Sequence, residues 1–168
     1  MPGYVIHLAV GKVYLKHNQI EDVAQFEEGI IAPDLSSDKS KSHYGQFSSS
    51  PDLNKFINEK GIDSSYLEGY FLHLLTDYLF YNRFLKSWAS SLYTDYNKLN
   101  RKLIQKYGIV VPKEIRGIVK FEDGMPDMLD EQELYQFIES VGNINVRQIV
   151  LQRERNIQNI IDQEYRSE

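Results

Sequence analysis

Apolar residues recur at helical spacing along most of the chain, and no segment shows the alternation of apolar and polar residues that is typical of a strand. Over residues 4–16, apolar positions such as Ile6 and Val10 lie three or four residues apart, and His7 lies on the adjoining stripe. A second short helix is expected over residues 20–28. The pattern therefore predicts an all-α fold.

The helical pattern breaks between Gly29 and Pro51. Proline, glycine and several serines interrupt this stretch, and a loop of that length is uncommon unless it has a function. Pro51 suits the first turn of a helix, and Gly61 is expected to end it. We therefore expect a long, functional loop between the first helices.

Residues 65–87 form the strongest predicted helix. Ser65 and Glu68 have the spacing of a capping box at its start. Apolar residues then cover nearly every face, which indicates a helix buried at the centre of the protein.

Further helices are predicted over residues 89–107, closed by Gly108, over residues 130–141, and over residues 145–165. No internal repeat, low-complexity stretch or domain boundary is evident. We therefore expect a single helical domain over residues 1–168. It should be a multi-helix bundle with a long loop between the first helices and a buried central helix.

Composition narrows the classes of function. The formal net charge of -5 gives no electrostatic reason to expect a nucleic acid partner. The absence of cysteine excludes disulfides and thiolate metal ligands, so nitrogen and oxygen ligands would have to hold any metal. No signal peptide and no apolar run long enough for a membrane span are recognisable, so we expect a cytoplasmic protein.

His73 and Asp77 are the first candidates for chemistry. They lie four residues apart on the most apolar helix and therefore share one helix face. Burying an imidazole and a carboxylate costs several kcal/mol unless both groups find partners. Either they satisfy each other and nearby polar groups, or they bind a metal.

His7 favours the metal interpretation, although a lone histidine in a core is the default. Gly11 lies one turn after His7, and Gly69 lies one turn before His73. These glycines would let the first helix and the central helix approach closely beside the two histidines.

Asp34 and His43 lie in the predicted loop between those helices. Asp34 directly follows Pro33, in a turn that proline stiffens. Taken alone, Asp34 is more often a helix cap and His43 an exposed loop residue. Together with His7, His73 and Asp77 they form a set of nitrogen and oxygen ligands typical of zinc.

The order of these elements resembles the bacterial zinc-dependent phospholipase C family. The resemblance covers about residues 4–83 and rests on four elements in this order. They are His7, Gly-Ile-Ile-Ala-Pro-Asp ending at Asp34, Ser-His ending at His43, and Gly-Tyr-Phe-Leu-His-Leu-Leu-Thr-Asp ending at Asp77. That family is all-helical and hydrolyses phosphate diesters at a zinc cluster. The remainder of the chain, residues 89–168, would complete the bundle.

The resemblance implies specific roles. Asp34, His43, His73 and Asp77 would hold one zinc ion, and Asp77 would bridge to a second ion held by His7. Asp34 would also be the catalytic residue that orients or deprotonates the attacking water. No histidine follows His73, so the third zinc site of the secreted enzymes cannot be assembled, and one or two ions, zinc or another divalent metal, are expected.

Two further residues are candidates for substrate binding, namely Tyr70 and Arg83, although an exposed or rim arginine is the commoner interpretation of Arg83. The expected function is a metal-dependent phosphoric ester hydrolase that acts through a metal-activated water on a phosphorylated small molecule or lipid head group. A non-catalytic helical module with a structural metal site, serving a protein partner, is the alternative. A nucleotide phosphohydrolase of the helical HD type is disfavoured, because the chain contains no adjacent His-Asp pair.

Overall fold

The computed structural model describes residues 3–152 and 155–167. Within these residues the regular secondary structure consists of helices, with no strand. The described residues form nine α-helices, a π-helical turn η1 and a 3₁₀ turn η2. In chain order they are α1 (Tyr4–His17), α2 (Val23–Leu35), α3 (Lys39–His43), α4 (Leu53–Glu59), α5 (Ser65–Leu79), η1 (Phe80–Phe84), α6 (Ser91–Tyr107), η2 (Lys113–Ile115), α7 (Glu131–Gly142), α8 (Val146–Leu151) and α9 (Ile157–Ser167). The predicted all-α bundle is confirmed.

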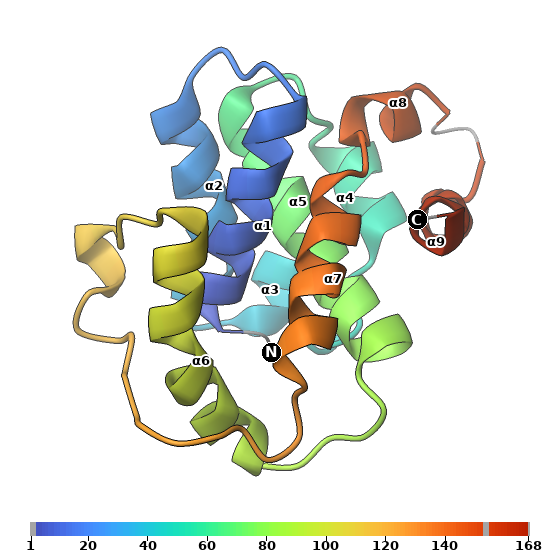
Figure 1. Ribbon diagram of the computed structural model, residues 1–168. Coiled ribbons are helices and arrows are strands. Elements are labelled where there is room, and N and C mark those ends of the chain that lie inside the picture. Colours follow the sequence, from blue (N-terminus) through green and yellow to red (C-terminus); the bar gives the residue numbers. More distant parts are fainter. Residues whose placement is uncertain (1–2, 153–154, 168) are drawn as a thin grey trace.

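Helices α1 and α5 form the interior of the bundle. Every residue from Phe71 to Phe80 is buried, as the apolar sequence of this segment predicted. Helix α1 is buried on nearly all sides from Val5 to Tyr14, because α2, α5, α6 and α7 all pack against it. Figure 1 shows α1 and α5 in the middle of the bundle, with α6 and α7 on the near side.

Two glycines allow α2 and α5 to pack with their backbones in contact. A Cβ atom on Gly29 would lie 2.1 Å from the carbonyl oxygen of Tyr66, and one on Gly69 would lie 2.1 Å from the carbonyl oxygen of Phe26. Real Cβ atoms do not approach a carbonyl so closely, so only glycine fits at these two positions. This contact brings the end of α2 against the middle of α5.

The prediction that Gly11 and Gly69 bring α1 and α5 together was therefore wrong. Gly69 faces α2, and a Cβ atom on Gly11 would meet the Ile30 side chain of α2 at 2.4 Å. Both glycines make room for α2, which extends further toward the C-terminus than the sequence patterns indicated.

The predicted break from Gly29 to Pro51 was also wrong in part. Helix α2 continues through Gly29 and ends at Leu35, with Pro33 inside its last turns. Burial of apolar residues against α1 and α5 outweighs the backbone hydrogen bond that Pro33 cannot donate. The short helix α3 follows, capped by Asp38, whose side chain accepts from the N–H groups of residues 40 and 41.

The central helix differs from its prediction at both ends. Ser64, not Ser65, is the N-cap, and its side chain accepts from the N–H of Leu67. At the other end the α-helix stops at Leu79 and a single π-helical turn follows, closed by a 2.8 Å hydrogen bond from the N–H of Leu85 to the carbonyl of Phe80.

The predicted C-terminal helix over residues 145–165 is two helices, α8 and α9. The side-chain oxygen of Asn54 accepts a 2.8 Å hydrogen bond from the N–H of Ile157, so α9 begins anew against α4. Arg83 of η1 fixes the same helix through a 2.7 Å ion pair with Asp162. Among the residues that the structure describes, no helix has the length and apolarity required to cross a membrane.

Candidate metal centre

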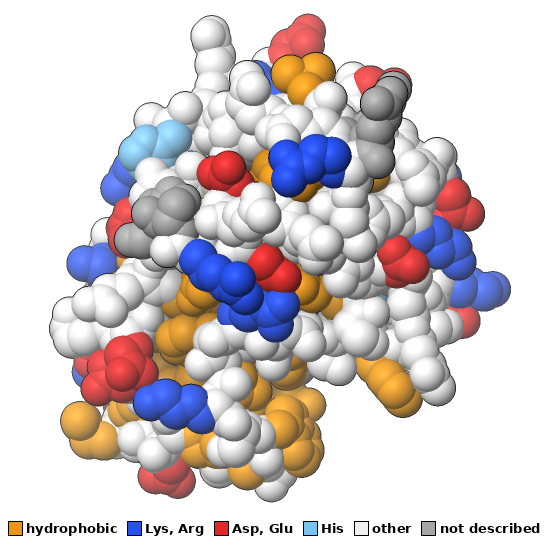
Figure 2. Space-filling model, turned by 90° about the vertical axis from the view of Figure 1, so that its right-hand side faces the viewer, with side chains coloured by type: hydrophobic (Ala, Val, Ile, Leu, Met, Phe, Trp, Pro, Cys, Tyr) orange, Lys and Arg blue, Asp and Glu red, His pale blue; other side chains and the backbone are white. Residues whose placement is uncertain are grey.

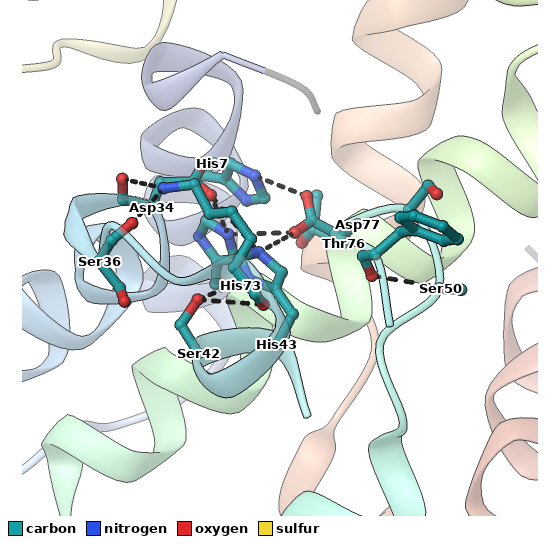
Figure 3. Close-up of polar contacts among 12 residues, drawn as sticks. His7, Asp34, Ser36, Ser42, His43, Ser50, His73, Thr76 and Asp77 are labelled. Carbon is teal, nitrogen blue, oxygen red and sulfur yellow. Dashed lines mark hydrogen bonds and ion pairs between the residues drawn. The ribbon is translucent and has the colours of Figure 1, made fainter. Parts of the chain in front are cut away.

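Four side chains from three helices converge beneath the surface of the bundle. Asp34 comes from the last turn of α2, His43 ends α3, and His73 and Asp77 occupy successive turns of α5. Each offers one nitrogen or oxygen atom, and these four atoms all lie within 4.8 Å of one another. Figure 3 shows their imidazole and carboxylate groups pointing toward one another.

The spacing of these atoms fits a tetrahedral metal ion. Asp34 Oδ1 lies 3.4 Å from His43 Nε2 and 3.5 Å from His73 Nε2, and Asp77 Oδ2 lies 2.9 Å and 3.1 Å from the same two nitrogens. Zinc bonds of about 2.0–2.1 Å in tetrahedral geometry separate neighbouring ligand atoms by about 3.3 Å. These four nitrogen–oxygen distances are therefore close to those expected around one divalent ion.

His7 adds a fifth donor on the far side of Asp77. Its Nε2 lies 3.0 Å from Asp77 Oδ1, whereas Asp77 Oδ2 faces His43 and His73. The two oxygens of Asp77 thus face two different sets of nitrogens. The His7 ring also stacks on the His73 ring, with centroids 3.6 Å apart.

Contacts behind the imidazoles fix their orientation. His73 Nδ1 donates to the carbonyl oxygen of Ile30 at 2.6 Å, which leaves Nε2 directed at the carboxylates. His43 Nδ1 pairs with Ser42 Oγ at 2.8 Å, and the Tyr70 hydroxyl donates to the Ser42 carbonyl at 2.5 Å. Such partners behind a metal-binding histidine set its tautomer and its ring orientation.

The polar atoms at the centre of this cluster have no hydrogen-bond partner. These buried atoms are both nitrogens of His7, both carboxylate oxygens of Asp34 and of Asp77, and Nε2 of His43 and of His73. The nitrogen–oxygen distances among them are 2.9–3.5 Å, but these contacts do not have the angles of hydrogen bonds. Each buried polar group without a partner costs about 1–3 kcal/mol, and more if it is charged. A cation bound among Asp34, His43, His73 and Asp77 would give one atom of each of these four side chains a partner.

Electrostatics in the metal-free cluster favour charged carboxylates. Burial raises the pKa of Asp34 and of Asp77, but the positive charge of His73 and contacts with the other histidines outweigh burial and hold both below their ordinary values. Burial lowers the pKa of His73, yet the charges of Asp34 and Asp77 reverse this and raise it to about 10. Burial and the charge of His73 lower the pKa of His7.

The cluster is closed to solvent. His7, Asp34, His43, His73 and Asp77 are each at most 6 % exposed. None of five clefts on the described surface has a lining residue from this set. A ligand larger than an ion could reach these atoms only if covering segments moved.

All five residues that the sequence suggested as metal ligands are therefore brought together. The two suggested substrate residues have structural partners: the Tyr70 hydroxyl holds Ser42, and Arg83 pairs with Asp162 and contacts the Tyr78 hydroxyl. Their roles toward a substrate stay predictions.

Sequence patterns missed Ser42 and the Ile30 carbonyl, which orient the two histidines. Ser42 directly precedes His43 and could have been suspected from that position alone. The Ile30 carbonyl could not, because a backbone acceptor leaves no signal in the residue type.

Comparison with known proteins adds no assignment: no protein-family model, curated protein or solved structure matches this chain. The cluster of Asp34, His43, His73 and Asp77 is thus a possible metal site on the strength of its own geometry.

Proposed function

We propose that this protein is a metal-dependent hydrolase of phosphate esters or diesters, with Asp34, His43, His73 and Asp77 holding one divalent ion and His7 with Asp77 holding a second. Zinc is the expected metal, since imidazole and carboxylate ligands suit it. The proposal agrees with the resemblance of residues 4–83 to zinc-dependent phospholipases C.

The observation that carries the proposal is the position of the Asp77 carboxylate. One oxygen faces His43 and His73 at 2.9 Å and 3.1 Å, and the other faces His7 at 3.0 Å. A structural zinc site is complete with four protein ligands. Such a site would not need His7, the fifth donor, which faces the other oxygen of Asp77. Bridging carboxylates of this kind are expected where two ions act together on a phosphoryl group.

The metal would supply charge stabilisation for the phosphoryl oxygens and would lower the pKa of a water molecule. The contribution of the chain itself lies in Asp34. Its Oδ1 faces His43 and His73, whereas Oδ2 is buried without a partner. Because its pKa is held below the ordinary value, Asp34 is ionised near neutral pH, and Oδ2 can accept a hydrogen bond that orients the attacking water.

Complete burial supports a second candidate, a structural metal site in a non-catalytic helical module. Catalytic zinc sites keep a position open to water or substrate, whereas these ligands are closed to solvent. In this case a single ion would fill the four-donor cluster and link α2, α3 and α5.

The test is elemental analysis of protein purified without an affinity tag, together with hydrolysis of a chromogenic phosphodiester. The matched variants are His73→Ala and His17→Ala, because His17 is exposed at the end of α1. The proposal expects about two ions per chain and hydrolysis in the wild type and in His17→Ala, and neither in His73→Ala.

One ion per chain without turnover, together with a fall in thermal stability on chelation, would establish the structural site instead. Absence of metal in all three proteins, with no change in stability on adding zinc, would overturn both candidates.

A further inference from the structure

A surface cleft lies between the segment that follows α3 and the segment that joins η1 to α6. It encloses about 660 Å³, a volume ordinary for a small-molecule site. Its lining includes Phe47, Tyr81, Asn82, Lys86, Trp88 and Tyr93, together with the serines at positions 48–50. Figure 2 shows hydrophobic side chains gathered at the lower end of one face, the end at which the chain runs from η1 toward α6 in Figure 1.

Both walls of the cleft continue directly from metal-site residues. The wall that begins at Phe47 lies four residues after His43, and the wall that begins at Tyr81 lies one helical turn after Asp77. Ser50, from the first wall, is drawn in the same close-up as Asp77 in Figure 3. One hydrogen bond between the walls is donated by Asn82 Nδ2 to the Ser49 carbonyl at 3.1 Å.

Three aromatic side chains in the cleft expose unusually large areas. Phe47 is 60 %, Trp88 59 % and Tyr93 50 % exposed. Trp88 and Tyr93 meet edge to face, with planes at 79°, and their exposed area leaves ring surface available to a third ring. Stacking of a planar group on such faces is favourable beyond the area that it buries.

The remaining lining groups are polar and suit a ring that carries a charged substituent. Serine hydroxyls, the Asn82 amide and the buried, unpartnered Tyr81 hydroxyl lie among the aromatic rings. An alkyl chain would offer the Tyr81 hydroxyl no hydrogen bond and would cover the other polar groups at a cost. Within residues 3–152 and 155–167, Lys86 has no ion-pair partner, so its ammonium is available to an anion.

We propose that this cleft binds the organic group of the substrate and that this group is a planar aromatic ring attached to the phosphate. The proposal rests on the proposed function of the neighbouring metal centre. The ring would stack among Phe47, Trp88 and Tyr93, with Lys86 toward the phosphate. Movement of the Phe47–Ser50 wall would then open the way to Asp77.

The chain provides its own probe, because Trp88 is the only tryptophan. The experiment titrates the full chain with phenyl phosphate, n-hexyl phosphate and inorganic phosphate and follows tryptophan fluorescence. Phenyl and hexyl phosphate carry the same charge and the same number of carbon atoms, so their comparison isolates ring stacking. We expect phenyl phosphate to change the fluorescence saturably and to bind at least tenfold more tightly than the other two.

Matched variants locate the binding. Phe47→Ala and Lys86→Ala should each weaken phenyl phosphate binding by about tenfold, the range expected for losing one stacking or charge contact. Phe121→Ala is the control, because Phe121 is 46 % exposed but does not line the cleft. Equal effects of Phe47→Ala and Phe121→Ala would overturn the proposal.

Two other outcomes would also overturn it, namely tighter binding of hexyl phosphate, which would indicate an aliphatic substrate, and no saturable signal with any probe. Failure of the proposed function is distinguishable, because none of the cleft residues is a metal ligand. If a chain that holds no metal binds phenyl phosphate, the cleft is still a ligand site, but the proposed hydrolase activity is wrong.

Discussion

The imidazole rings of His7 and His73 lie face to face, with centroids 3.6 Å apart and planes within 8° of each other. Two protonated rings in this arrangement would repel each other, so one must be neutral. The pKa values assign the charge: that of His73 is raised by Asp34 and Asp77, and that of His7 is lowered by burial and by His73. His7 is therefore the ring already in the neutral form that binds a metal.

We predict that His7→Ala removes one of two bound ions and leaves the other. The four-donor cluster does not include His7, so it should keep its ion, whereas the donor facing Asp77 Oδ1 is lost. Metal content measured by elemental analysis should fall from about two to about one per chain. His17→Ala should keep both ions, and loss of all metal in His7→Ala would contradict the two-site arrangement.

The stability of the metal-free protein should fall between about pH 6.5 and pH 10. The pKa of His73 rises from an ordinary 6.5 to about 10 in the fold, because the carboxylates outweigh burial. A raised pKa means that the folded protein holds the proton more tightly, so this stabilisation is complete below pH 6.5 and disappears as pH rises through 10. Urea unfolding in a chelator across this range measures it.

Zinc should reverse that pH dependence up to about neutral or mildly alkaline pH. A metal needs the imidazole without its Nε2 proton, so binding releases protons and tightens as pH rises. The difference in stability between zinc-loaded and metal-free protein should therefore grow with pH. A difference that does not change with pH would indicate that zinc binds elsewhere.

The ligand residues could be found from sequence because their types and order carry the signal. His73 and Asp77 share a helix face by spacing alone, and their apolar surroundings required a partner for each. The placement of Asp34 could not be found in this way. Gly29 and Pro33 both suggested that α2 stops early, yet the fit of Gly29 against the Tyr66 carbonyl continues the helix to Leu35. That contact joins residues distant in sequence, and no local pattern reports it.

Gly69→Ala tests the packing that brings Asp34 to α5. The new Cβ would meet the Phe26 carbonyl at 2.1 Å, and a backbone atom can move away only if the helices separate. We expect a net loss of about 1–3 kcal/mol in the free energy of unfolding, despite the higher helix propensity of alanine. The control is Gly117→Ala, where nothing lies within 4 Å of the added atom and the change should stay within about 0.5 kcal/mol.

Asp95→Asn should destabilise the segment that leads into α7. The buried Asp95 carboxylate accepts three backbone N–H groups, from Asp127 at 2.7 Å, Met128 at 2.7 Å and Leu129 at 3.0 Å. An amide would point its own N–H group at one or more of these donors. We expect a loss of about 2–3 kcal/mol in urea unfolding. Asp123→Asn, at a fully exposed side chain, should have almost no effect, and equal losses would show that Asp95 has no special role.

Tyr70→Phe separates two roles for Tyr70. The hydroxyl donates to the Ser42 carbonyl at 2.5 Å, and Ser42 Oγ contacts His43 Nδ1. The ring stacks on Phe56 at 5.2 Å and would remain in Tyr70→Phe, so the variant removes the hydrogen bond alone. If Tyr70 orients His43, zinc affinity should fall about tenfold to a hundredfold, as for other groups behind metal ligands.

If Tyr70 instead contacts substrate, zinc affinity in competition with a chelator should stay unchanged and KM should rise. Tyr66→Phe is the matched control, because this exposed tyrosine lies one turn before Tyr70 on α5 and no hydrogen bond of its hydroxyl is among those described. A fall in zinc affinity in Tyr70→Phe but not in Tyr66→Phe would show that Tyr70 orients His43 by holding Ser42 in place. Zinc affinity would then depend on a residue that does not contact the ion.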